Sequence, residues 1–178
     1  WMFYPYHVQH QNEGYRFFTY MFIHADTMHL FFNMFVLYSF GRNMEFLLGL
    51  EYGAPLAYVH YGIIYFAGGL FATVWPMIKN SDNPNYLSLG ASGAVSSMFF
   101  AFILWMPSAE LQLIFIPGVP IPAWLFGLLY LGYEYFMAKR GTSNIGHDAH
   151  FGGAIFGIVY VLFINFDKGR EFITYILG

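Results

Sequence analysis

Three short motifs carry side chains that could act together on a carbonyl group. The first, Gly90-Ala91-Ser92-Gly93, places a serine between glycines. Glycine allows a tight turn and close approach of another chain, and the first backbone N–H groups of a following helix are free. Taken alone, the motif is more typical of a serine that caps a helix. With a histidine in hydrogen-bonding range, Ser92 would instead be an activated nucleophile.

A suitable histidine lies in the second motif, Ala149-His150-Phe151-Gly152-Gly153, which is followed by Gly157. Gly153 and Gly157 are four residues apart on one helix face, so another helix can pack closely there. The helix that begins near Ala91 offers a matching face of small residues, Gly93, Ala94, Ser96 and Ser97. Close packing of these two helices would bring His150 to Ser92. A histidine used for packing, or a His147–His150 metal pair, is the alternative for this motif alone.

The third motif contains His24, His29 and Asn33. His29 and Asn33 are four residues apart, so they share one face of a helix. Buried imidazoles and amides in a membrane need hydrogen-bond partners and often mark function. Beside Ser92 they would stabilise the negative oxygen of a tetrahedral intermediate, together with the backbone N–H of Ser92. Hydrogen bonding between helices is the structural alternative.

The elements that must position these motifs are apolar helices. Of the 178 residues, 58% are hydrophobic and 10% charged, and the mean hydropathy is +0.49, whereas about 25% of an ordinary soluble domain is charged. A helix needs about 20 mostly apolar residues to cross a bilayer. Tracts such as 149–166 are apolar on every side, which excludes the alternating pattern of a membrane β-barrel. We predict a single all-α domain over residues 1–178, a polytopic transmembrane helical bundle.

Five tracts without charged residues indicate five spans, and residues 1–23 form an interfacial loop. Asp26 is expected to cap the first span, Gly49 to close it and Pro76 to end the second. Residues 107–122 hold four prolines and are expected to form a connecting loop. The odd-numbered spans begin at one membrane face, so the three motifs share a layer. The expected spans are about 27–48, 54–75, 91–106, 123–138 and 149–166.

Several function classes are excluded by composition. The chain has no cysteine, so thiol catalysis and cysteine-ligated zinc are not available. The net charge of −3 gives no indication of nucleic-acid binding. The seven histidines are scattered and no His-Glu-x-x-His occurs, so neither a metal nor another cofactor is expected. Because the sequence opens on Trp1, we also expect that an upstream segment has been removed.

Taken together and in this order, the motifs resemble the rhomboid family of intramembrane serine proteases. The resemblance covers most of residues 15–166. The matching residues are Tyr15-Arg16, His24, His29, Asn33, Glu45, Gly90-Ala91-Ser92-Gly93, Ala149-His150, Gly153 and Gly157.

The resemblance implies a Ser92–His150 dyad in a water-filled cavity below the membrane surface. Ser92 would attack the peptide carbonyl, His150 would carry the proton to the leaving amine, and His29 and Asn33 would support the oxyanion. No Asp occupies a third catalytic place, as is usual for this family. Arg16 and Glu45 would be structural, as would His24 and the four motif glycines. Residues 139–148 would form a loop over the site, and the fourth span a lateral gate.

The resemblance further implies substrates that are single-span or polytopic membrane proteins, cleaved within the lipid bilayer. We expect an integral membrane protein of the bacterial inner membrane. Two alternatives stay open: a rhomboid-like protein that binds or escorts membrane helices without cutting them, and a channel or transporter that uses its histidines.

Three departures from the family pattern affect these expectations. The first of six core spans is missing, and Tyr15 stands where tryptophan is common. Ser96 occupies a place where some relatives have a tyrosine against the histidine ring, so the orientation of His150 must rest on other residues.

Glu134 is interpreted as structural.

Overall fold

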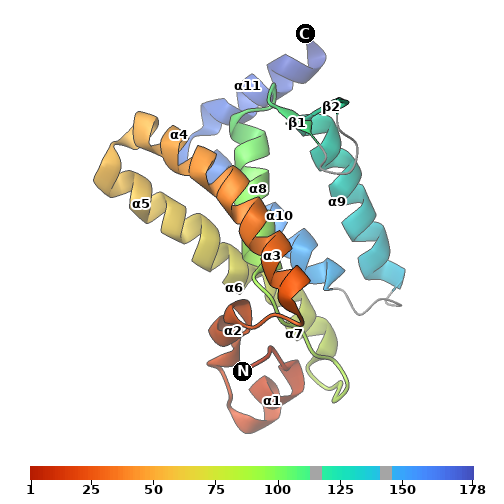
Figure 1. The fold of residues 1–178 in the computed structure, drawn as a ribbon. Coiled ribbons are helices and arrows are strands. Elements are labelled where there is room, and N and C mark those ends of the chain that lie inside the picture. The colour runs from red at the N-terminus through yellow and green to blue at the C-terminus, as the bar shows by residue number, and fades with distance from the viewer. Residues whose placement is uncertain (113–117, 141–145) are drawn as a thin grey trace.

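Helix α8, Ser92–Trp105, lies at the centre of a helical bundle. The computed structural model describes residues 1–112, 118–140 and 146–178, and α8 is buried along almost its whole length. Long helices lie on either side of it (Figure 1), and its side chains have little contact with the surroundings. Because α8 is apolar on all faces, it can be surrounded in this way at little cost in unpaired polar groups.

The described elements follow one another mostly as helices. In chain order they are α1 (Pro5–Gln11), α2 (Arg16–Thr19), a 3₁₀ turn (Tyr20–Phe22), α3 (Thr27–Val36), a π turn (Leu37–Gly41), α4 (Arg42–Tyr52), α5 (Ala54–Gly62), a second π turn (Ile63–Ala67), α6 (Gly68–Ala72), α7 (Val74–Asn80), α8, β1 (Glu110–Gln112), β2 (Pro120–Pro122), α9 (Ala123–Arg140), α10 (His147–Ile164) and α11 (Phe166–Leu177).

The first long helical segment runs from α3 through the π turn to the end of α4. Its start was predicted correctly: Asp26 Oδ1 accepts the backbone N–H of His29 at 2.7 Å, so Asp26 is the cap. Its predicted end at Gly49 is wrong, because the helix continues to Tyr52. Gly53 ends it with a φ of +76°, a conformation that costs glycine little.

The second long segment, α5 to α7, continues beyond its predicted end at Pro76. The helix breaks at Thr73, and Pro76 lies in the first turn of α7. A proline is tolerated in a first turn because the N–H that it lacks has no helical partner there. The prediction missed the break that makes this possible.

The proline-rich stretch between α8 and α9 contains an antiparallel pair, β1 and β2, and is more than a loop. Glu110 pairs with Pro122, and Gln112 pairs with Pro120. Proline fits at the edge of a two-stranded sheet, where one side of each strand needs no partner. Residues 113–117, which the sequence placed in the same loop, lie outside the described residues.

Two helical segments among the described residues are long and apolar enough to cross a membrane: 54–80 and His147–Ile164. Helix α8 is apolar but shorter. Helix α9 matches the fourth expected span to within two residues, and α10 begins two residues before the fifth. The fold is therefore mostly helical, as expected, while the five spans and the missing first span stay predictions.

The N-terminal segment packs at the end of the bundle where α3 and α8 begin (Figure 1). Phe3, Tyr20 and Met21 are buried together there. The Arg16 side chain donates to Glu13 Oε2 at 2.5 Å and to the carbonyl oxygen of Met2 at 2.8 Å. The same hydrogen bond lowers the pKa of the Glu13 carboxyl. Arg16 thus links the start of this segment, at Met2, to Glu13, in keeping with the structural role that the resemblance implied.

Candidate active site

Ser92 is the first residue of α8, and the loop before it is shaped by glycine. Gly90 has a φ of +111°, and a Cβ there would lie 2.6 Å from Cε1 of His29. Any other residue would meet both backbone strain and the histidine ring. The backbone N–H of Gly90 donates to the Tyr20 carbonyl at 3.0 Å. The loop therefore rests against the N-terminal segment and the His29 ring just before the serine.

Helix α10 packs against α8 at backbone distance. A Cβ on Gly153 would overlap the carbonyl oxygen of Gly93, and one on Gly157 would overlap the carbonyl oxygen of Ser97. Both glycines therefore allow the close helix packing that their spacing predicted. Two of the predicted small residues of α8, Gly93 and Ser97, lie opposite them. This close contact places the first turns of the two helices beside each other.

His150 and Ser92 come together as a result. His150 Nε2 lies 2.7 Å from Ser92 Oγ, although the two residues are 58 positions apart in the chain. The distance is that of a good hydrogen bond. With an Nδ1–H tautomer, Nε2 accepts the serine O–H, which is the arrangement that a serine nucleophile needs.

A carboxylate, which the sequence analysis did not place here, lies behind the histidine. Glu134 Oε1 is 3.2 Å from His150 Nδ1, and Glu134 Oε2 is 2.6 Å from His147 Nδ1. The Tyr130 hydroxyl lies 3.5 Å from His150 Nδ1. Glu134 and Tyr130 both come from α9. Both contact the His150 ring, whose orientation the sequence analysis assigned to residues other than Ser96.

The signal for Glu134 was present in the sequence but was interpreted as structural. It is the one charged residue between 111 and 138 in the sequence, and an ionisable group inside a membrane helix is by default a candidate for function. The sequence contained no evidence for its partner, because the rotation of α9 relative to α10 depends on tertiary packing.

His29 and Asn33 lie in the same cavity as the reacting pair. The cavity has a volume of about 1020 Å³ and is lined by Ser92 and His150 as well as by residues of α3 and α9. Asn33 is buried, and its amide donates to the carbonyl oxygen of His29 at 2.9 Å. The structure thus gathers all three motifs at one site, as the parity of the spans predicted.

His24 contacts the other side of the serine loop. Its Nε2 lies 3.4 Å from the backbone nitrogen of Ala91 and accepts that N–H. Burial lowers the pKa of His24, and the nearby His29 ring lowers it further. A neutral ring is required for this hydrogen bond, so the lowered pKa preserves it near neutral pH.

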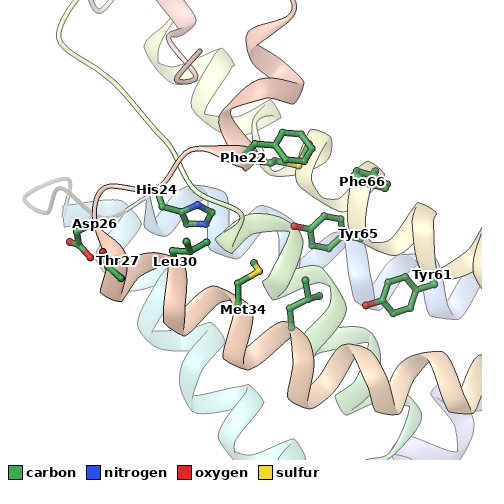
Figure 2. A pocket seen from close by; sticks show the side chains of 11 residues that line it. Phe22, His24, Asp26, Thr27, Leu30, Met34, Tyr61, Tyr65 and Phe66 are labelled. Carbon is green, nitrogen blue, oxygen red and sulfur yellow. The ribbon is translucent and has the colours of Figure 1, made fainter.

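A second, mainly apolar cavity of about 790 Å³ lies along the other face of α3. Figure 2 shows Leu30 and Met34 of α3 facing Tyr61 and Tyr65 across it. His24 lies at its polar end. Helix α3 therefore has a cavity on each of two faces, one of them containing Ser92.

Two expected features differ from their predictions in the described residues. Glu45 is exposed on α4 and does not line the Ser92 cavity. Of the expected loop 139–148, the first two residues belong to α9 and the last two to α10. Residues 141–145, the centre of that loop, lie outside the described residues.

Among the described residues, Glu134, His147 and His150 have donor atoms within 4.8 Å of one another. Two imidazoles and a carboxylate are a ligand set that zinc accepts. Here each imidazole is hydrogen-bonded to one oxygen of the Glu134 carboxylate, and these bonds satisfy the carboxylate without an ion.

A helical bundle in which a serine contacts a histidine at one cavity fits the rhomboid class that the motifs indicated. The Rhomboid domain family matches residues 11–165 of the chain. The chain therefore belongs to the Rhomboid family, whose members are generally intramembrane serine proteases. The resemblance drawn from the motifs is confirmed.

Three relatives illustrate the similarity. RHOMBOID-like protein 12, mitochondrial, of Arabidopsis thaliana is 30% identical over 85% of this chain and 46% of its own length. Presenilin-associated rhomboid-like protein A, mitochondrial, of Danio rerio is 30% identical over 79% and 35%. Rhomboid protein 1, mitochondrial, of Saccharomyces cerevisiae is 31% identical over 84% and 42%. The chain thus spans less than half the length of these relatives. No solved structure matches it significantly.

The relatives also correct the expected location. Plant, fish and yeast relatives are all named as mitochondrial, so the expectation of a bacterial inner membrane is wrong. Apolar helices suit any bilayer of similar thickness, and their composition therefore does not identify the organelle or the organism.

Proposed function

We propose that the protein is an intramembrane serine endopeptidase with Ser92 as nucleophile and His150 as general base. The observation that carries this is the 2.7 Å contact between Ser92 Oγ and His150 Nε2 inside a cavity. Membership of the Rhomboid family supports it.

The reaction follows from this contact. Ser92 Oγ forms a bond to the peptide carbonyl carbon as its proton passes to His150 Nε2, and the carbonyl electron pair moves to the oxygen. The intermediate collapses, the C–N bond breaks, and His150 returns the proton to the leaving amine. Water then hydrolyses the acyl-serine by the same steps. The backbone N–H of Ser92, with His29 and Asn33, is proposed to stabilise the oxyanion.

The protein is proposed to work in a mitochondrial membrane. Large apolar side chains are exposed on the outer helices, among them Phe31, Trp75 and Phe163. Such a surface is suited to lipid rather than water. Five spans, an interfacial segment over residues 1–23 and a lateral gate at α9 complete the proposal.

The proposed substrates are membrane proteins cleaved within or beside a transmembrane helix. The cavity lies between α3 and α9, and its lining is mainly apolar with polar groups such as Ser39 and Gln112. A helical substrate must unwind before its carbonyl reaches Ser92, since its amides are paired. Cleavage is therefore expected beside a small residue, near glycine, proline or polar residues that weaken the helix.

A fluorophosphonate probe tests the proposal directly. We expect covalent labelling of the full-length protein in lipid, because the probe reacts with an activated serine. Ser92→Ala should remove the labelling, whereas Ser96→Ala, one turn further along α8 and in the same cavity, should retain it. Absence of labelling in a folded sample would leave the escort or transport alternatives and reject the protease.

Asn33→Ala is expected to lower kcat by about 10–1000-fold with little change in KM, because an oxyanion donor acts only in the transition state. Asn43→Ala is a matched control. Asn43 lines the same cavity and also donates to the carbonyl oxygen four residues before it, at 2.6 Å.

Cleavage of a single-span substrate in proteoliposomes gives both constants. An equal loss for Asn33→Ala and Asn43→Ala, or a loss that follows thermal unfolding, would make Asn33 a packing residue.

A further inference from the structure

Glu134 is among the most buried carboxylates of the described chain. Its side chain is 3% exposed, and those of His147 and His150 are 4% and 13% exposed. An ionised carboxylate removed from water in this way is costly unless it accepts hydrogen bonds. The two imidazoles supply these bonds, one to each carboxylate oxygen.

The hydrogen bonds specify which nitrogen of His150 carries the proton. The carboxylate can only accept, so His150 donates Nδ1–H to Glu134 Oε1. Nε2 is then unprotonated and faces Ser92 Oγ. This is the tautomer that a general base requires. The hydrogen bond to Glu134 therefore determines both the tautomer and the orientation of the His150 ring.

Asp148, the other buried acid near His150 in the chain, is hydrogen-bonded to different groups. Its Oδ1 accepts from the Tyr86 hydroxyl at 3.3 Å and from the backbone N–H of Ala149 at 3.0 Å. Burial raises the pKa of Tyr86, and the Asp148 charge raises it further, so the hydroxyl keeps its proton and donates. Among the described residues, Glu134 is the carboxylate that faces the histidine.

We propose that Glu134 is the positioning residue of a Ser92–His150–Glu134 triad, and that His147 holds the second oxygen of its carboxylate. This inference rests on the proposed function. It replaces the two-residue dyad expected from the sequence with a three-residue arrangement. Because Glu134 lies on α9 while Ser92 and His150 lie on α8 and α10, the orientation of the base depends on a helix that carries neither reacting atom.

Glu134→Gln tests the positioning role. Glutamine keeps the shape but presents an NH₂ group, which cannot accept from both histidines. We expect kcat for a single-span substrate in proteoliposomes to fall by about 10²–10⁴-fold, with KM nearly unchanged, as for loss of an orienting carboxylate in other triads. The rate of fluorophosphonate labelling should fall in parallel.

Glu134→Asp should recover part of the rate, because it restores an acceptor that is one methylene shorter. Asp148→Asn is the matched control. It neutralises a buried acid next to the site that does not face His150, so kcat should change little. Substrate binding to Ser92→Ala and to the Ser92→Ala/Glu134→Gln double variant should be equal, since neither can react.

The outcomes separate this inference from the proposed function. A wild-type protein that cleaves and labels at Ser92, with Glu134→Gln within about tenfold of it, would overturn the triad and leave the protease. So would a loss that appears in KM alone, or a Glu134→Asp variant no better than Glu134→Gln. Wild-type protein without Ser92-dependent activity would overturn both.

A metal at these three residues would also overturn the positioning role. Purified wild-type protein would then contain stoichiometric zinc by elemental analysis, Glu134→Gln would lack it, and a chelator would abolish wild-type labelling. We expect full activity in chelator. Should Glu134→Gln not fold, the comparison of Glu134→Asp with Asp148→Asn decides the question by the same split of kcat and KM.

Discussion

Replacing His150 with alanine is expected to lower kcat by about 10⁴–10⁶-fold, the loss seen when the base of a serine nucleophile is removed. The serine hydroxyl does not ionise by itself near neutral pH. The imidazole 2.7 Å away is its proton acceptor. The same group protonates the leaving amine, so both halves of the reaction lose their proton carrier. Single-turnover cleavage in proteoliposomes, with labelling rates, measures the effect.

His60→Ala is the control for loss of an imidazole. His60 is hydrogen-bonded to the Tyr160 hydroxyl at 2.8 Å and does not line the Ser92 cavity. Its replacement should leave the labelling rate close to that of the wild type. A His150→Ala protein that labels within about tenfold of the wild type would show that Ser92 is activated by another group.

The second large effect is expected at Gly153. An added methyl group would overlap the Gly93 carbonyl oxygen, and a backbone atom cannot rotate away as a side chain does. Helices α8 and α10 must separate, at a cost of about 1–3 kcal/mol or more for an overpacked core. Separation also lengthens the Ser92–His150 contact, and a shift of about 1 Å can cost about 10²-fold in rate. Thermal unfolding and labelling rate together test Gly153→Ala.

Gly157→Ala and Gly62→Ala complete this series. Gly157 lies one turn further from the reacting pair and faces the Ser97 carbonyl oxygen, so stability should fall with a smaller effect on rate. Beyond its own helix backbone, a methyl group added at Gly62 would meet no atom within 4 Å, and alanine there should be neutral or stabilise the helix by up to about 1 kcal/mol. Equal unfolding temperatures for Gly153→Ala and Gly62→Ala would contradict the close-packing account.

Much of the site could be predicted because its motifs are local. The spacing of Gly153 and Gly157 defines one helix face, and charge-free tracts indicate apolar helices. Both follow from the period of a helix and from the composition of the chain. The pairing of Ser92 with His150 then followed from the order of the spans and from which helices could approach closely.

The ends of the helices were less predictable. Gly49 and Pro76 looked like terminators, but each has a helical conformation in the structure and the chain continues past it. Glycine and proline permit a helix to end without requiring it. The actual interruptions lie at Gly53 and Thr73, several residues from the expected ends.

By itself, the sequence determined the helical class, the helix face of Gly153 and Gly157 that packs closely, and the residues that could react. These depend on residue type and on spacing within one helix. The tertiary structure alone decided that Glu134 faces His150 and His147. That contact depends on the rotation of α9 about its own axis and on its distance from α10, which no pattern within either helix specifies.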